Sequence, residues 1–113
     1  MYKVLYYVNR RGDLPAKEFI CSLELKVRAK VMKWIELLEE KGPDLPRPYA
    51  DVLRDKIREL RISHGRLEIR ILYFISKNSL IVLTNGFFKK EQETDRMEID
   101  KAIKCMDEYI SRG

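Results

Sequence analysis

Apolar and polar positions alternate along several segments of the chain, which predicts β-strands. Residues 2–8 are rich in Val, Leu and Tyr and end at a polar, glycine-containing cluster, so we expect a first strand there. Residues 59–62 and 67–75 each divide into two alternating series of side chains, and an apolar run covers residues 80–88. Short turn-like stretches separate these three segments, which are therefore predicted to form a meander of three strands.

Elsewhere, apolar residues recur at every third or fourth position, which predicts three helices. The first follows Asp13, a capping residue type, and has a proline in its first turn. The second covers residues 25–41 and ends at a Gly-Pro pair. The third begins near Asp95, with a glutamate at capping-box spacing. Residues 43–52 contain three prolines and are predicted to form a loop.

The predicted order β-α-α-β-β-β-α is typical of an α+β fold, with helices packed on one face of an antiparallel sheet. We expect a single domain over residues 1–113 and a functional surface on the opposite face of the sheet. Arg61 and Arg70 alternate with core aliphatic residues, so both are expected on that face. An arginine among apolar residues is unfavourable unless it is paired or lies at the wet rim of a cleft.

Composition narrows the class of protein. Charged residues make up 36% and hydrophobic residues 45% of the 113 residues, which excludes a disordered chain. No apolar run reaches the ~20 residues of a transmembrane helix, and no secretory signal begins the chain, so we expect a cytosolic protein without a membrane partner. Cys21 and Cys105 lack metal-ligand spacing and are expected to be reduced and buried, without a metal site. The single histidine, His64, excludes a mechanism with two imidazoles.

The net charge of +5 is unevenly distributed. Residues 1–12 contain three basic and no acidic residues, and residues 47–70 contain seven basic and four acidic residues. This surplus indicates an anionic partner. Two arginines with lysines at the end of the next strand suit a phosphate. RNA adds a 2′-hydroxyl that attacks the adjacent phosphorus without a metal, if the protein aligns it and stabilises the developing charge.

Other interpretations of the same residues stay open at this point. Arg61 and Arg70 can be surface arginines that pair with nearby glutamates. His64 lies in a predicted turn, where an inert exposed imidazole is the commoner case. Tyr73 alternates with core residues. Of Phe87 and Phe88, one can lie in the core and the other can stack on a base.

Three central segments together resemble the phage-derived, HigB-like branch of the RelE/ParE toxin superfamily. Residues 53–61 match the shape L-x-D-G-hydrophobic-x-E-L-R, residues 70–74 match R-hydrophobic-x-Y, and residues 86–94 match G-F-x-K-K-x-x-x-T. Residues 15–20 and 98–102 also match in kind. The chain departs from the pattern at Lys56, where glycine is frequent, and at Thr84-Asn85, where an aliphatic-His pair is frequent.

The resemblance implies an RNase-like toxin of a type II toxin-antitoxin pair that cleaves mRNA, commonly on the ribosome, without a cofactor. It implies a protein antitoxin, expected to be a helix-turn-helix protein encoded in the adjacent gene. It implies that Arg61 and Arg70 bind the phosphate and stabilise the charge of the transition state, and that Lys89 or Lys90 binds phosphate or transfers a proton. The further residues predicted to bind RNA are Arg54, Lys56, Arg58, His64, Tyr73 and Phe88. A ParE-like gyrase inhibitor without nuclease activity and an RNA-binding module without catalysis remain alternatives.

Overall fold

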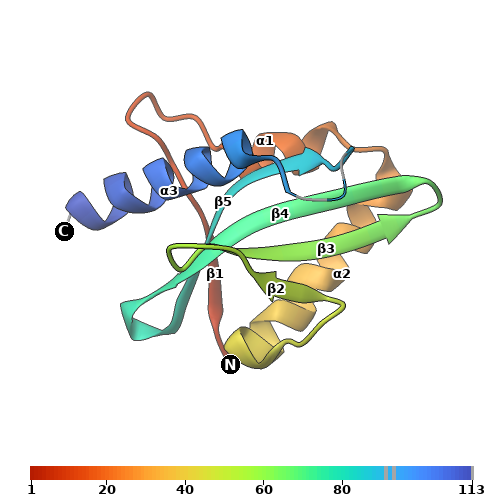
Figure 1. The fold of residues 1–113 in the computed structure, drawn as a ribbon, viewed down its shortest axis with the longest axis horizontal. Helices are drawn as coiled ribbons and strands as arrows, with labels where there is room; N and C mark the ends of the chain where they lie inside the picture. Colours follow the sequence, from red (N-terminus) through yellow and green to blue (C-terminus); the bar gives the residue numbers. More distant parts are fainter. Residues whose placement is uncertain (91, 93, 113) are drawn as a thin grey trace.

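The computed structural model describes residues 1–90, 92 and 94–112, and Figure 1 shows how they are arranged. Within these residues the chain forms one five-stranded sheet and three α-helices. In chain order the elements are β1 (Lys3–Tyr6), α1 (Pro15–Ser22), α2 (Leu25–Lys41), the 3₁₀ turn η1 (Gly42–Asp44), β2 (Ala50–Val52), β3 (Arg58–His64), β4 (Leu67–Ser76), the 3₁₀ turn η2 (Lys77–Ser79), β5 (Leu80–Phe88) and α3 (Arg96–Ser111).

The strands follow the order β1-β5-β4-β3-β2 across the sheet. The pairs β2–β3, β3–β4 and β4–β5 are antiparallel, and the last two form the predicted meander. Strand β1 lies at one edge and is parallel to β5. The prediction of an antiparallel sheet is therefore wrong for β1. Parallel neighbours need a long crossover between them, and here the helices and three strands that separate β1 from β5 in the sequence supply it.

The predicted element order is one strand short, because β2 lies in the stretch predicted as a loop. β2 has only three residues and follows a proline-rich stretch. A segment this short shows no alternation of apolar and polar residues. β2 exists through its pairing with β3, in which Asp51 lies opposite Glu59. This pairing places an acidic side chain beside the central strands.

The helices cover both faces of the sheet, which corrects the expectation that they pack on one face. α1 and α2 cover the face that buries Leu60 and Tyr73, and α3 crosses the other face above Leu72 and Phe74 (Figure 1). The reason lies in β4, where both alternating series are apolar and both faces therefore need cover. α3 packs against β5 and β4, so the second face stays open beside β3.

The helix ends follow local hydrogen bonds. α2 spans the predicted residues, and Asp95 caps α3 as predicted by accepting a hydrogen bond from the Met97 N–H at 2.8 Å. Asp13 does not cap α1, because its carboxylate instead accepts a hydrogen bond from the side chain of Asn9 at 3.2 Å. The preceding turn therefore takes the side chain that was expected at the helix terminus.

Candidate functional site

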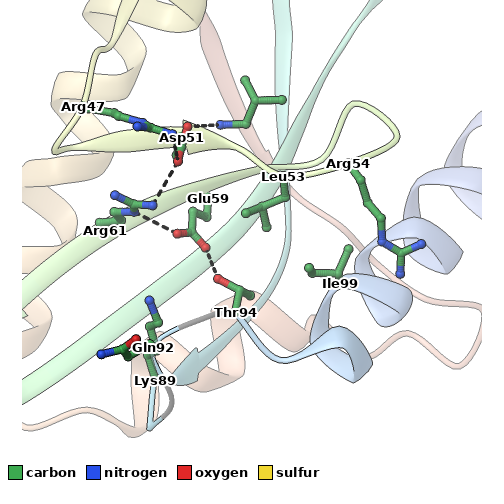
Figure 2. A pocket seen from close by; sticks show the side chains of 11 residues that line it. Arg47, Asp51, Leu53, Arg54, Glu59, Arg61, Lys89, Gln92, Thr94 and Ile99 are labelled. Atoms are coloured by element: carbon green, nitrogen blue, oxygen red, sulfur yellow. Dashed lines mark hydrogen bonds and ion pairs between the residues drawn. The ribbon is translucent and has the colours of Figure 1, made fainter.

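A cavity of about 550 Å³ opens on the second face of the sheet (Figure 2). It lies between the β2–β3 hairpin, the end of β5 and the beginning of α3. The described residues that line it are Arg47, Asp51, Val52, Leu53, Arg54, Glu59, Arg61, Lys89, Gln92, Thr94 and Ile99. Three of them, Arg54, Arg61 and Lys89, are predicted site residues, and the structure brings them together from the β2–β3 turn, β3 and the end of β5.

Charged side chains alternate in sign along one wall of the pocket (Figure 2). Arg47 Nη2 donates a hydrogen bond to Asp51 Oδ2 at 2.8 Å, and Arg61 Nη2 donates to the same oxygen at 3.0 Å. Arg61 also donates through Nε to Glu59 Oε1 at 2.8 Å. Arg61 is therefore held between two carboxylates, while 30% of its side chain remains exposed.

Glu59 is the buried member of this wall and joins several elements. It accepts a hydrogen bond from the Thr94 hydroxyl, and Arg70 Nε lies 3.6 Å from its Oε1. Arg70 is opposite Arg61 in the β3–β4 pairing, as expected for two residues that share a face. However, Arg70 is only 6% exposed and also pairs with Glu68 at 3.4 Å. The structure thus places Arg70 behind Glu59 rather than in the pocket, which corrects the expectation of a direct phosphate contact.

The two lysines after β5 differ in position. Lys89 lines the pocket and extends toward Arg61 and Glu59 in Figure 2. Its backbone N–H donates to the Glu68 carbonyl at 2.7 Å, which continues the pairing of β4 with β5 past the end of β5. Lys90 is exposed and is not among the described lining residues. Of the predicted pair, the geometry favours Lys89 for contact with a ligand.

Asp51 is ionised at neutral pH, so it contributes a negative charge to this wall. The hydrogen bond from Arg47 is the largest cause that holds the pKa of Asp51 below its ordinary value. The backbone N–H of Val52 and the charge of Arg61 lower this pKa further, against the opposing effect of partial burial. Arg61 therefore already has an anion beside it in the unliganded protein.

The opposite wall of the pocket is apolar and ends in an ion pair. Val52, Leu53 and Ile99 supply aliphatic surface, and Arg54 pairs with Asp100 of α3. This ion pair connects the β2–β3 turn to the helix. The pocket therefore presents charged groups on one side and aliphatic side chains on the other, an arrangement that suits a ligand with both an anionic group and a ring.

The turn that carries Lys56 has an uncommon backbone. Asp55 and Lys56 have φ values of 51° and 73°, and the Ile57 N–H donates to the Arg54 carbonyl at 2.9 Å. Positive φ at both central residues is the signature of a type I′ hairpin turn, in which glycine is favoured. Lys56 therefore adopts the conformation that glycine would take, and it places an exposed positive charge at the rim beside Arg54.

Two predicted RNA-binding residues lie on the other face of the sheet. Tyr73 is fully buried among the residues that α2 covers, and this burial raises the pKa of its hydroxyl to about 12. Arg58 pairs with Tyr73 across the strands and shares its face. The prediction that Tyr73 binds RNA is wrong for this structure, because a fully buried ring cannot contact a ligand. Arg58 is half-buried and points away from the pocket wall formed by Glu59 and Arg61.

His64 and Phe88 also lie apart from the pocket. His64 is the last residue of β3, five positions beyond Glu59, which corresponds to about 16 Å along a strand. Phe88 packs edge-on against Phe19 of α1, with ring centroids 5.2 Å apart, and is 43% exposed. Neither side chain is brought to Arg61, so a role for either in RNA binding would need a second contact surface.

The structure adds three residues that the sequence reasoning did not assign to the site. Arg47 and Asp51 lie in the stretch predicted as a loop, where no periodicity connects them to Arg61. Thr94 ends the G-F-x-K-K-x-x-x-T segment, and its position in that motif was a usable signal. Only the pairing of β2 with β3 and the return of the chain after β5 bring these three side chains to Arg61 and Glu59.

Other candidate chemistry is limited. In the part of the chain that the structure describes, no group of three or more His, Cys, Asp or Glu side chains is placed to hold a metal ion. Cys105 is partly buried, which raises the pKa of its thiol to about 11. Cys21 is exposed on α1, contrary to the expectation that both cysteines are buried, because it lies on the side of the helix turned away from Ile20 and the core.

The fold defines the structural class. A mutant of the E. coli toxin RelE in the free state shares it, with a TM-score of 0.61 over 91% of this chain and 95% of that chain, at 16% sequence identity. This likeness confirms the predicted RelE-like α+β architecture. No curated protein matches the sequence.

Sequence similarity then gives the particular family. The chain belongs to the family of phage-derived Gp49-like proteins (DUF891), whose profile matches residues 18–107. The matched segment includes both walls of the pocket and most of the three helices. The predicted relation to phage-derived, RelE-like proteins is thereby confirmed. Among the helices that the structure describes, none is long and apolar enough to cross a membrane.

Proposed function

We propose that this protein is the toxin of a type II toxin-antitoxin pair and that it cleaves mRNA without a metal ion. The observation that carries the proposal is the pocket in which Arg61 and Lys89 face an apolar wall, on a RelE-like fold in a phage-derived family. A bound nucleotide would place its phosphate at the basic residues and its base along Leu53 and Ile99. The HigB-like motif series supports an mRNA bound on the ribosome as the substrate.

The reaction is an attack of the RNA 2′-hydroxyl on the adjacent phosphorus. The 2′-oxygen gives up its proton to solvent water and forms a bond to phosphorus, and the bond from phosphorus to the 5′-oxygen of the next nucleotide breaks. A 2′,3′-cyclic phosphate and a 5′-hydroxyl result. Arg61 stabilises the charge on the phosphate oxygens, and Lys89 stabilises or protonates the departing 5′-oxygen. Alignment of the reacting groups supplies the remaining rate enhancement.

Arg70 has an indirect role in this proposal. Because it is buried and pairs with Glu59, it holds the carboxylate that in turn orients Arg61. Arg54 and Lys56 form a basic rim that attracts the RNA backbone. Lys90 contributes to the same attraction from outside the pocket. Arg70 is thus a positioning residue, and Arg61 and Lys89 are the residues in contact with the substrate.

The proposal includes a partner and a compartment. A cytoplasmic protein antitoxin, encoded in the adjacent gene, would neutralise the toxin by covering the pocket or the surface that docks on the ribosome. Its acidic segments would bind the basic rim, so raised salt should weaken the complex.

Expression of the toxin alone tests the proposal. The wild type should arrest growth and truncate transcripts, whereas Arg61→Gln and Lys89→Ala should each reduce cleavage by about 100-fold, in line with the loss of one charge-stabilising donor. Lys77→Ala is the matched control, because Lys77 is exposed in η2 at the other end of β4 and should leave cleavage unchanged. Primer extension on total RNA measures the cleavage.

Purified protein gives the second readout. Cleavage of ribosome-bound mRNA should persist in excess chelator and should leave 5′-hydroxyl ends. Full toxicity of both Arg61→Gln and Lys89→Ala, or loss of cleavage on chelation, would contradict the proposed mechanism.

The alternative of a gyrase-inhibiting toxin has one supporting observation. The carboxylates of Asp51 and Glu59 already pair with Arg61, so the pocket wall is less basic than its arginines alone indicate. A protein-binding inhibitor does not need an open phosphate site. Induction of the DNA-damage response with intact mRNA would favour this alternative over RNA cleavage.

A further inference from the structure

Asp51 occupies the position on Arg61 at which an external anion would bind. One oxygen, Oδ2, accepts hydrogen bonds from Arg47 at 2.8 Å and from Arg61 at 3.0 Å. The two guanidinium groups come from different elements, the loop before β2 and strand β3. Two charged donors that converge on one oxygen form the same arrangement that a phosphate oxygen accepts.

We infer that Arg47 and Arg61 form a phosphodiester-binding site, and that the carboxylate of Asp51 fills it until an RNA phosphate displaces the carboxylate. The inference rests on the proposed function for the identity of the ligand. It adds Arg47 as a binding residue and Asp51 as the group that competes with RNA. Binding would then exchange one anion for another rather than neutralise two unpaired cations.

The surroundings of Asp51 permit this exchange. Its second oxygen, Oδ1, accepts a hydrogen bond only from the N–H of Val52 at 2.9 Å among the described groups. Asp51 lies on the three-residue edge strand β2, and 18% of its side chain is exposed, against 1% for Glu59. The Arg47 side chain is 75% exposed, so its guanidinium group is open to solvent. A rotation of the Asp51 side chain would therefore leave both guanidinium groups facing the pocket.

Glu59 differs from Asp51 in each of these respects. Only 1% of its side chain is exposed, and it pairs with Arg61, Arg70 and Thr94 at once. Moving this carboxylate would leave the buried Arg70 with Glu68 as its one carboxylate partner among the described residues, which is costly. Glu59 is therefore the fixed partner that holds Arg61 in place, and Asp51 is the exchangeable one.

Binding of a short 2′-O-methyl single-stranded RNA tests the inference, because this probe cannot undergo attack by a 2′-hydroxyl. Asp51→Asn keeps the size of the side chain and removes its charge, and it should tighten binding by about fivefold, the scale of one or two partly exposed ion pairs. Asp44→Asn is the matched control. It makes the same change in net charge at an exposed residue of η1 outside the pocket lining and should alter affinity by less than about twofold.

A second variant, Arg47→Ala, tests the role of Arg47 independently of Asp51→Asn. Arg47→Ala should weaken binding of the same RNA and should remove the gain produced by Asp51→Asn when the two changes are combined. It should also lower the slope of log affinity against log salt by about 0.7, the value for one phosphate contact on a single strand. Arg11→Ala is the control, since the Arg11 side chain is 85% exposed, against 75% for Arg47, and pairs with one carboxylate, Asp13.

The outcomes separate this inference from the proposed function. Equal affinities for Asp51→Asn and Asp44→Asn, or equal effects of Arg47→Ala and Arg11→Ala, would overturn the inference even if the wild type cleaves mRNA. The predicted gain in affinity without any cleavage by the wild type would support the anion site and reject the nuclease. Thermal unfolding of each variant confirms that the comparison is made between folded proteins.

Discussion

At the scale of single residues, the pocket depends on how each charge is compensated. Arg61 and Arg70 are direct cross-strand neighbours, and like charges in such positions repel each other. Glu59 lies beside both, at 2.8 Å from Arg61 and 3.6 Å from Arg70, and so makes the pair of arginines tolerable. A buried carboxylate of this kind explains why two arginines can occupy one face of a central hairpin.

Lys56 carries a prediction at this scale. An L-residue in the left-handed region is strained by about 1–2 kcal/mol, and glycine recovers part of this at a cost in unfolded-state entropy. Lys56→Gly should therefore raise the free energy of unfolding by about 0.5–1 kcal/mol. Urea denaturation measures the change.

The matched control is Lys56→Ala, which removes the same charge but keeps a Cβ at φ 73°. Equal stabilities of Lys56→Gly and Lys56→Ala would show that backbone strain at this turn contributes nothing.

At the scale of elements, the glycine of the G-F-x-K-K motif serves packing rather than ligand binding. A Cβ placed on Gly86 would lie 2.4 Å from Phe19 Cδ2 and 2.8 Å from Ile71 Cδ1. Gly86 is on the face of β5 that α1 covers, opposite to the pocket. Its small size therefore allows α1 to approach the sheet closely, and the same contact fixes the end of β5 that leads into Lys89.

Gly86→Ala should accordingly destabilise the fold by about 1–3 kcal/mol, the usual cost of overpacking a core. The cost should fall when Phe19→Ala removes the ring that the new methyl group meets. A double-mutant cycle followed by thermal unfolding measures this coupling. Additive effects of the two changes would contradict the packing explanation.

At the scale of the whole molecule, one polar cluster joins the segment after β1 to the end of α3. The Tyr7 hydroxyl donates to Glu108 Oε1 at 2.7 Å, across 101 residues of sequence. Arg112 donates from Nε to Glu108 at 2.6 Å and from Nη2 to the Val8 carbonyl at 2.6 Å. These contacts hold the last turns of α3 beside the segment that follows β1.

The pKa of Glu108 predicts how this cluster responds to acid. The hydrogen bond from Arg112 is the largest cause that lowers the pKa of Glu108 below 4.5, and the hydrogen bond from Tyr7 adds to it. A carboxyl group whose pKa is lowered by folding stabilises the protein above its unfolded pKa. This contribution is therefore complete above about pH 5 and declines as the pH falls through 4.5 and below.

Glu108→Gln measures the effect. The variant should be less stable than the wild type at pH 7, and the difference should shrink toward pH 3. Glu36→Gln, at an exposed position of α2, should show a smaller difference at pH 7. A gap between the wild type and Glu108→Gln that stays constant from pH 7 to pH 3 would be inconsistent with the assigned ion pair.

The predictability of the structure follows the range of the interactions involved. The bounds of α2 and the cap of α3 depend on residues close in the sequence, and both were predicted from it. The alternation of β3 and β4 likewise predicted that Arg61 and Arg70 share one face of the sheet, and the register of the two strands makes them direct neighbours. The burial of Arg70 and Tyr73 was not predicted with the same certainty of position, because it depends on which elements pack on each face of the sheet.

The sequence by itself determined the α+β class, the central meander, the family resemblance and the basic character of the middle of the chain. These properties rest on local periodicity, turn chemistry and motif spacing. The tertiary structure alone decided that β2 pairs with β3, that α3 covers part of the second face, and that Asp51 and Glu59 both pair with Arg61 while Thr94 donates to Glu59. Strand pairing and helix packing connect residues far apart in the chain, and no pattern within one segment carries that information.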